Sequence, residues 1–311
     1  MLDALSKSFF HALARSQSIE RLASRYGMAK PTSFGRRFIA GETVEEAMDA
    51  ARILQGQGML LTLDQLGESI TTKAEADAAT TGCLGLIEHV VAAGVDRNVS
   101  VKLTQLGLEI DPAVARDNLR RILTLAKQHD MFVRVDIENT PYIQKTFDVF
   151  ATVWDAGFRN TGVALQSAVF RSEDDARAFC KAGIRIRLVK GAYKEPPNLA
   201  HQAKADVDAA YVRIMQILLA SGVYHAIATH DPAMIDATKT FAAQQQIPKD
   251  KYEFQMLFGI RRDLQAALLR DGYRMRIYVP FGKQWFPYFM RRLGERPANV
   301  GFVLKGIFGE R

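Results

Sequence analysis

Cysteine is scarce in this chain of 311 residues. Cys83 and Cys180 are the only two, they lie far apart, and they form no C-x-x-C motif. A disulfide framework and a cysteine-rich metal site are therefore excluded. The composition favours a reducing compartment in which both residues are buried thiols.

Several functional signatures are also missing. No run of about 18 apolar residues occurs, so no transmembrane helix is expected. The first 27 residues lack the apolar core and cleavage site of a signal peptide, and we interpret them as an amphipathic helix. No H-x-H or H-E-x-x-H motif is present, so no metal site is expected. The Rossmann, P-loop and G-x-S-x-G fingerprints are absent too.

Positive charge prevails, with a net charge of +7 and an isoelectric point near 9.4. This balance favours anionic partners. The basic residues are spread along the chain without aromatic interleaving, so we expect no nucleic-acid binding. We expect a cytoplasmic protein that can make a peripheral contact with the inner face of the cell membrane. The N-terminal amphipathic stretch could serve this contact, or could dock on the rest of the protein.

Short β-type segments recur along the chain with helical sequence between them. They lie at residues 58–68, 99–107, 131–139, 162–167, 184–193, 224–231, 251–257 and 273–282. Helix starts are recognisable between them, such as Asp111 before Pro112. Eight strand–helix units predict an α/β protein with a distorted (β/α)8 TIM barrel. We assign residues 1–50 to an N-terminal helical extension and residues 51–311 to the barrel.

The inner faces of the predicted strands are polar. In "IRIRLVKGAY", alternation places Arg185 and Arg187 opposite the apolar residues. The other residues predicted to point inward are Thr62, Asp64, Ser100, Lys102, Thr104, Arg134, Asp136, Glu138, Gln166, Glu253, Gln255, Arg274, Arg276 and Tyr278. A buried charge is costly unless an opposite charge pairs with it or it takes part in binding or catalysis. We interpret Arg134, Glu138 and Arg185 as a self-neutralising ion network and expect chemistry from the groups nearest the strand ends.

Two lysines are candidate nucleophiles. Lys102 points inward and could form a Schiff base with a carbonyl substrate. Lys190 shares the parity of Leu188 and points outward unless the strand bends at Gly191.

The segment "QWFPYFMRRLGERPAN" predicts a short helix after the eighth strand. Tyr288, Arg291 and Arg292 fall on one face of it. Adjacent arginines can grip a carboxylate with bidentate hydrogen bonds, although a solvated basic face is the alternative. Tyr278 and Gly282 favour the carboxylate-binding interpretation, because they bring this helix over the barrel mouth.

Six segments resemble the proline dehydrogenase family, in particular its monofunctional bacterial members. They are "RRFIAGET", "LDQLGE", "VKLTQLG", "RLVKGAY", "EFQMLFGI" and "YVPFG…YFMRRLGERPAN", in family order over about residues 36–305. The resemblance implies a barrel that binds FAD without a Rossmann domain and oxidises L-proline to Δ1-pyrroline-5-carboxylate. It also implies hydride transfer from the proline ring carbon to flavin N5, electron transfer to a membrane quinone, and a separate pyrroline-5-carboxylate dehydrogenase chain.

The resemblance further implies the residues on the cofactor side. Arg187 would lie at the flavin N5 edge and stabilise the charge of reduced flavin. Gln166 would form a hydrogen bond with the flavin ring. The other residues implied to line FAD are Ile137, Val189, Lys190, Gly191, Ala192, Thr229 and His230. For His230, a helix-capping role is the alternative.

On the substrate side, the resemblance implies that Lys102, Arg291 and Arg292 clamp the proline carboxylate. Asp136 would orient this cationic cluster and counter its charge, or accept a proton. Glu68 would pair with Arg291 as a lid. The residues implied to enclose the pyrrolidine ring are Tyr193, Leu257, Tyr278 and Tyr288. Tyr278 also favours proline over hydroxyproline.

Two other functions stay open at this point. One is a Schiff-base lyase on the same barrel, with Lys102 as the nucleophile. The other is a basic, non-catalytic module that binds nucleic acid or lipid.

Overall fold

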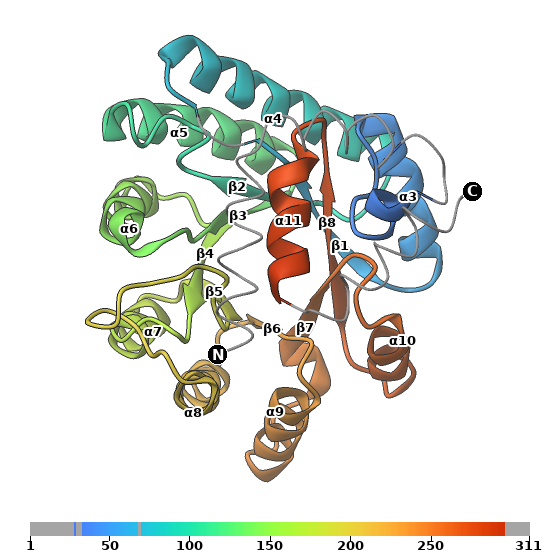
Figure 1. Ribbon diagram of the computed structural model, residues 1–311, viewed down its shortest axis with the longest axis vertical. Coiled ribbons are helices and arrows are strands. Elements are labelled where there is room, and N and C mark those ends of the chain that lie inside the picture. The colour runs from blue at the N-terminus through green and yellow to red at the C-terminus, as the bar shows by residue number, and fades with distance from the viewer. Residues whose placement is uncertain (1–27, 29–32, 68–69, 296–311) are drawn as a thin grey trace.

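Eight parallel strands form a closed barrel in sequential order in the computed structural model, which describes residues 28, 33–67 and 70–295. The strands are β1 (Leu60–Gln65), β2 (Asn98–Lys102), β3 (Phe132–Asp136), β4 (Thr161–Gln166), β5 (Arg185–Val189), β6 (His225–Ala228), β7 (Tyr252–Leu257) and β8 (Met275–Phe281). Each lies inside a segment predicted from the sequence or begins within one residue of it. Pairing of β1 with β8 closes the barrel, which confirms the predicted TIM-barrel fold (Figure 1).

A helix follows each strand. These helices are α4 (Lys73–Ala93), α5 (Pro112–Gln128), α6 (Thr140–Asp155), α7 (Ser172–Lys181), α8 (Lys204–Ala220), α9 (Pro232–Gln244), α10 (Arg262–Arg270) and α11 (Trp285–Glu295), and a short 3-10 turn, η2 (Lys249–Lys251), precedes β7. The side chain of Asp111 accepts a hydrogen bond from the backbone N–H of Ala113 at 2.8 Å, which confirms the predicted helix start. In the described parts of the chain, no helix combines the length and apolar character that crossing a membrane requires.

The last helix, α11, departs from the ring formed by the others and lies across the middle of it in Figure 1. Its buried aromatic residues pack against Leu66 and Ile260, which follow β1 and β7. The carboxyl ends of the strands therefore lie beneath α11, as predicted for the barrel mouth.

The place beside β8 on the outer ring is filled by an earlier helix. Helix α3 (Val44–Gly56) packs on β1, β8 and α4. A 3-10 turn, η1 (Phe34–Arg37), precedes it, and Ala40 and Gly41 form backbone hydrogen bonds with Pro280 and Gly282 at 2.9 Å. Helix α3 runs across the predicted boundary between residues 50 and 51. The amphipathic stretch predicted over the first 27 residues lies outside the described residues.

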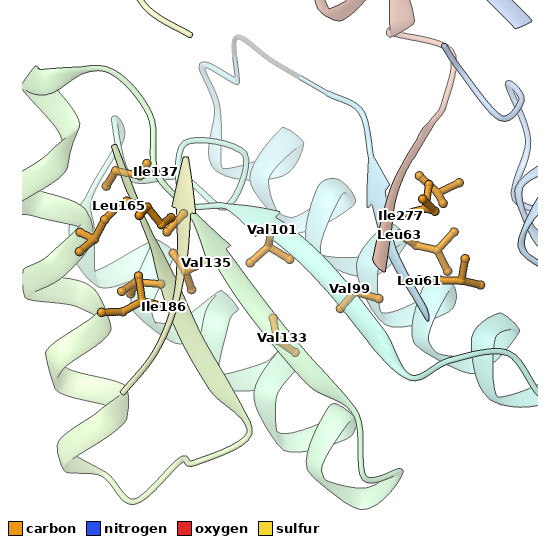
Figure 2. Close-up of a cluster of buried hydrophobic side chains, with 14 of the residues drawn as sticks. Leu61, Leu63, Val99, Val101, Val133, Val135, Ile137, Leu165, Ile186 and Ile277 are labelled. Carbon is orange, nitrogen blue, oxygen red and sulfur yellow. The ribbon is translucent and has the colours of Figure 1, made fainter. Parts of the chain in front are cut away.

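The main hydrophobic core lies between the strands and the surrounding helices. Figure 2 shows outward-facing strand residues such as Leu61, Val99 and Val133, all fully buried, gathered on that side. Cys83 belongs to the same cluster, and burial raises the pKa of its thiol to about 12. Cys180 is only half-buried. With the apolar residues on the outer face, the lumen is left to polar side chains.

Gly162 on β4 makes room for one of these polar side chains. It lies between Arg134 of β3 and Arg185 of β5 in the strand register. The Arg134 guanidinium crosses β4 and donates to the carbonyl oxygens of Val163 at 2.9 Å and Arg185 at 2.5 Å. A Cβ on Gly162 would lie 2.2 Å from the Arg185 oxygen and 2.7 Å from Arg134 Nη1.

Gly162→Ala should therefore lower the free energy of unfolding by about 1–3 kcal/mol, because backbone and guanidinium must both shift. Urea denaturation followed by circular dichroism measures the change. Gly85→Ala on α4 is the control, since nothing lies within 4 Å of its new Cβ and alanine favours a helix. Equal stability of the Gly162→Ala protein and the wild type would contradict the steric argument.

Candidate active site

The Arg187 guanidinium occupies the centre of the lumen, where three strands supply its partners. Nε donates to Gln255 Oε1 at 2.6 Å, Nη1 to Asp136 Oδ1, and Nη2 to Ser100 Oγ at 3.0 Å. The guanidinium carbon also lies 5.1 Å from the centre of the Tyr278 ring. Each nitrogen is thus engaged by a different residue, so the cation is held in one orientation at a side-chain exposure of only 5%.

A second buried ion pair lies in the same lumen. Lys102 Nζ donates to both carboxylate oxygens of Asp64, at 3.0 and 3.1 Å. Burial opposes the charge on Lys102, but Asp64 and Asp136 together raise the pKa of the ammonium above its ordinary value. Lys102 is therefore firmly protonated at neutral pH. This opposes the Schiff-base hypothesis, which needs a neutral amine as nucleophile.

Asp136 connects the Arg187 centre to β8. It accepts from Arg187 and from the Tyr278 hydroxyl, the latter at 2.8 Å. Burial, followed by the nearby charge of Asp136, raises the pKa of Tyr278 well above its ordinary value. Tyr278 therefore remains a neutral hydrogen-bond donor throughout the physiological range.

A separate ion network fills the lumen nearer the amino ends of the strands. Arg276 donates to Glu253 at 2.8 Å and to Asp96 at 2.5 Å, and Glu253 also accepts from Tyr224 at 2.9 Å. Burial opposes ionisation of Glu253, but the charge and hydrogen bonds of Arg276 outweigh it and lower the Glu253 pKa to about 2.

The ion network predicted for Arg134 and Arg185 is wrong. Arg134 donates to backbone carbonyls, and burial lowers the pKa of its guanidinium well below the ordinary value. Arg185 lies over the rings of Phe132 and Tyr224, with centroid distances of 4.4 and 4.7 Å. Glu138, the third predicted member, accepts from Thr104 Oγ1 at 2.8 Å. Arg274 was predicted to point into the lumen but is exposed and precedes β8.

Helix α11 brings the predicted substrate residues to the mouth. Tyr288 is buried, and the Arg292 guanidinium carbon lies 5.2 Å from the centre of its ring. Leu257, at the end of β7, packs against the same cluster. Arg291 is half-buried on this helix. Tyr193, in the loop after β5, lies near enough to Lys102 to influence the pKa of the ammonium. Glu68, predicted to pair with Arg291, lies outside the described residues.

The ends of β4 and β5 supply a vacant hydrogen-bond acceptor. Gln166 Nε2 donates to the Glu138 carbonyl at 2.8 Å, but its buried Oε1 has no hydrogen-bond partner among the described residues. Gly191 has a φ of +119°, and a Cβ there would lie 2.9 Å from that oxygen. A buried acceptor beside an obligatory glycine suits a ligand that offers an N–H group. These residues therefore fit the flavin hydrogen bond implied for Gln166.

Three other predicted cofactor residues lie around the start of α9. Lys190 points out of the lumen, as its parity predicted, and pairs with Asp208 and, at 2.6 Å, with Asp231. Thr229 Oγ1 accepts from the Asp231 N–H at 3.1 Å. His230 Nε2 accepts from the Leu257 N–H at 2.9 Å, and Asp231 is the residue that caps α9.

The remaining predicted cofactor residues do not all lie at the barrel mouth. Val189 and Ala192 are half-buried at the carboxyl end of β5 and in the loop after it. Ile137 belongs to the outer hydrophobic cluster, beside Val135 and Leu165 in Figure 2.

Sequence reasoning gave no role to three residues that the structure places against the central cations. The alternation predicts that Asp64, Ser100 and Gln255 point inward, but it assigns them no function. Each completes the hydrogen bonding of Lys102 or Arg187. The alternation shows that these side chains point into the lumen, where cations from other strands also point. Only the register between strands shows which of them meet.

Known proteins of one family are similar to this chain in sequence. A sequence model of the family described as proline dehydrogenase matches residues 47–305. Proline dehydrogenase 1 of Bacillus subtilis (strain 168) is 39% identical over 299 residues, covering 96% of this chain and 97% of that protein. Proline dehydrogenase of Deinococcus radiodurans is 39% identical over 311 residues, covering 99% of both.

Among solved structures, the chain is similar to proline utilization A (PutA) from Bdellovibrio bacteriovorus inactivated by N-propargylglycine. The TM-score is 0.80 at 25% sequence identity. The match covers 89% of this chain but 34% of that one, so this chain spans about a third of the length of that larger protein.

Replacing Glu253 should reveal the pH dependence of the lower ion network. The Glu253 pKa of about 2 lies below the ordinary value of 4.5, so its carboxylate stabilises the fold above pH 4.5 and loses this effect as the pH falls towards 2. Glu253→Gln should cost about 3 kcal/mol in the free energy of unfolding at pH 7. The difference from wild type should shrink below pH 4.5, as measured by urea denaturation between pH 7 and 3.

Asp77→Asn is the control, because it removes an exposed ion pair with Arg121 that contributes about 1 kcal/mol or less. A cost for Glu253→Gln that does not change with pH would contradict the assigned ionisation.

Proposed function

The chain belongs to the proline dehydrogenase family, and we propose that it oxidises L-proline to Δ1-pyrroline-5-carboxylate with FAD as its cofactor. The oxidoreductase activity follows from the family. The cofactor, the product and the residue roles are the finer part of the proposal. One observation supports them above all: Arg187 and Lys102 are buried in one lumen, each with its own carboxylate, beneath a helix that carries Arg291 and Arg292.

The charges of this arrangement suit an anionic substrate. Asp136 and Asp64 already balance Arg187 and Lys102, so the buried set carries no net charge. A proline carboxylate would add one negative charge, and Arg291 and Arg292 would face it from α11. Lys102 would donate a hydrogen bond to the carboxylate through the ammonium N–H that does not bond to Asp64. Rigid cations of this kind hold a small substrate in one orientation.

FAD, when bound, would accept the hydride at its N5 and hold the two electrons. The residues fitted to hold it are Gln166, through its vacant Oε1, together with the backbone at Val189, Gly191 and Ala192. Lys190, Thr229, His230 and Ile137 remain predictions as cofactor residues. Arg187 would place positive charge where negative charge gathers during reduction. Asp136 would keep that cation in place, and Tyr278 would close one side of the substrate site.

The remaining parts of the proposal concern the electron acceptor, the fate of the product, the residues around the substrate and the division of the chain. Electrons would pass to a membrane quinone through peripheral contact with the inner face of the cell membrane, which the net charge of +7 favours. The product would pass to a separate pyrroline-5-carboxylate dehydrogenase. Tyr193, Leu257, Tyr278 and Tyr288 would enclose the ring, with Glu68 as a lid partner for Arg291. The division into an N-terminal extension (1–50) and a barrel (51–311) also remains a proposal.

A visible absorption spectrum tests the proposed function directly. The purified protein should bind FAD, and its flavin absorbance should bleach when L-proline is added without oxygen. D-Proline provides a control with the same charge and opposite configuration. A protein that takes up no FAD, or whose flavin is unchanged by L-proline, would refute the proposal.

Removal of either α11 arginine should weaken substrate capture. We expect Arg291→Ala and Arg292→Ala each to raise KM by roughly 30- to 1,000-fold, equivalent to about 2–4 kcal/mol, because a buried carboxylate would lose a charged partner. Steady-state kinetics with L-proline measures this. Arg177→Ala is the matched control, because it breaks only an exposed pair with Glu173 on α7. An unchanged KM in both α11 variants would mean that the carboxylate is held elsewhere.

A further inference from the structure

Gln255 on β7 has no role in the proposed chemistry, yet it lies against the cation at its centre. We propose that Gln255 is a positioning residue, which fixes the orientation of the Arg187 guanidinium by linking it to the buried carboxylate of Glu253. The inference rests on the proposed function in one respect only, that the oriented guanidinium acts on a bound flavin.

The geometry of Gln255 is that of a bridge between opposite charges. Its Oε1 accepts from Arg187 Nε at 2.6 Å, and its Nε2 donates to Glu253 Oε1 at 2.5 Å. Gln255 and Glu253 are both 3% exposed, and Arg187 is 4% exposed. Because Gln255 and Glu253 are two residues apart on one strand, their side chains lie one above the other on the lumen face.

Only one orientation of the amide satisfies both neighbours. A guanidinium offers donors alone, and an ionised carboxylate offers acceptors alone. If the amide were turned over, its NH₂ group would face Arg187 and its oxygen would face Glu253, and both contacts would be repulsive. The charges on either side therefore lock Gln255, and Gln255 in turn fixes the position of Arg187 Nε.

The bridge is anchored from below. Glu253 is held by Arg276 at 2.8 Å and by Tyr224 at 2.9 Å, and Arg276 is held by Asp96 at 2.5 Å. Arg276 lies on β8, Tyr224 immediately precedes β6, and Asp96 lies two residues before β2. Without Gln255, Arg187 would keep Asp136 and Ser100, which engage its two terminal nitrogens. It would lose its contact at Nε and could tilt about the Asp136 pair.

Gln255→Leu tests the bridge, since leucine fills most of the volume and removes both hydrogen bonds. We expect the FAD-loaded variant to be reduced by L-proline about 10- to 100-fold more slowly, because a misplaced catalytic group costs rates of that order. The reduction potential of the bound flavin, measured against an indicator dye without proline, should become more negative. The affinity for a carboxylate analogue of proline that lacks the ring nitrogen should change by less than about twofold, because its anchors are elsewhere.

Asn118→Leu is the matched control, since Asn118 is a buried amide on α5 that donates to the Leu106 carbonyl. It should lower stability without moving the flavin potential. Gln255→Asn keeps an amide but withdraws it from Arg187, and should shift the potential in the same direction as Gln255→Leu. If both Gln255 variants fold and bind FAD with the wild-type potential and rate, the positioning role is wrong.

A flavin-free measurement separates this inference from the proposed function. In the protein without FAD, the Nε–H resonance of Arg187, assigned by its loss in Arg187→Lys, should exchange slowly with water. In Gln255→Leu, this exchange should accelerate at least tenfold, whereas in Asn118→Leu it should not change. Equal exchange in Gln255→Leu and wild type would overturn the bridge even if wild-type flavin is bleached by proline. Accelerated exchange would support it even if proline fails to bleach the flavin.

Discussion

The ion pair between Arg187 and Asp136 is the interaction on which the rest of the site depends. A guanidinium at the centre of a barrel is costly unless its charge and its N–H groups are satisfied. Asp136 supplies the opposite charge, while Ser100 and Gln255 occupy the remaining sides of the cation. Asp136 also receives the Tyr278 hydroxyl, so one carboxylate fixes a cation and a neutral donor together. Lys102 on β2 and Asp64 on β1 form a second buried ion pair of the same kind.

The barrel explains how so much charge can be buried at one place. Its outer strand faces hold the hydrophobic contacts with the helices, so folding energy does not depend on an apolar lumen. The lumen is divided into two levels. Glu253, Arg276 and Asp96 neutralise each other nearer the amino ends of the strands, and Arg187, Lys102 and their carboxylates gather nearer the carboxyl ends. Ligands of TIM barrels bind at the carboxyl ends, which is where α11 brings Arg291 and Arg292.

All eight strands were predictable, because alternation between apolar and polar residues leaves a strong signal when one face is a hydrophobic core. The inward direction of Arg187, Lys102 and Asp136 followed from the same alternation. The partners of these residues did not, because parity gives the face of a strand but not the level at which side chains meet across the lumen. That level depends on the register between strands. The same ignorance of register produced the mistaken ion network of Arg134 and Arg185, whose guanidinium groups instead contact carbonyls and aromatic rings.

Closure of the barrel joins parts of the chain that are synthesised far apart in time. The pairs Leu60–Arg276 and Gln65–Phe281 bring β1 against β8, and α3 and α11 complete the outer ring and the mouth. Contacts between segments so distant along the sequence form late, after shorter-range units have assembled. A nascent chain on the ribosome can thus build several βα units but cannot close the barrel or its mouth. Enzymatic competence must appear abruptly, once β8 and α11 have emerged, rather than accumulating as the polypeptide grows.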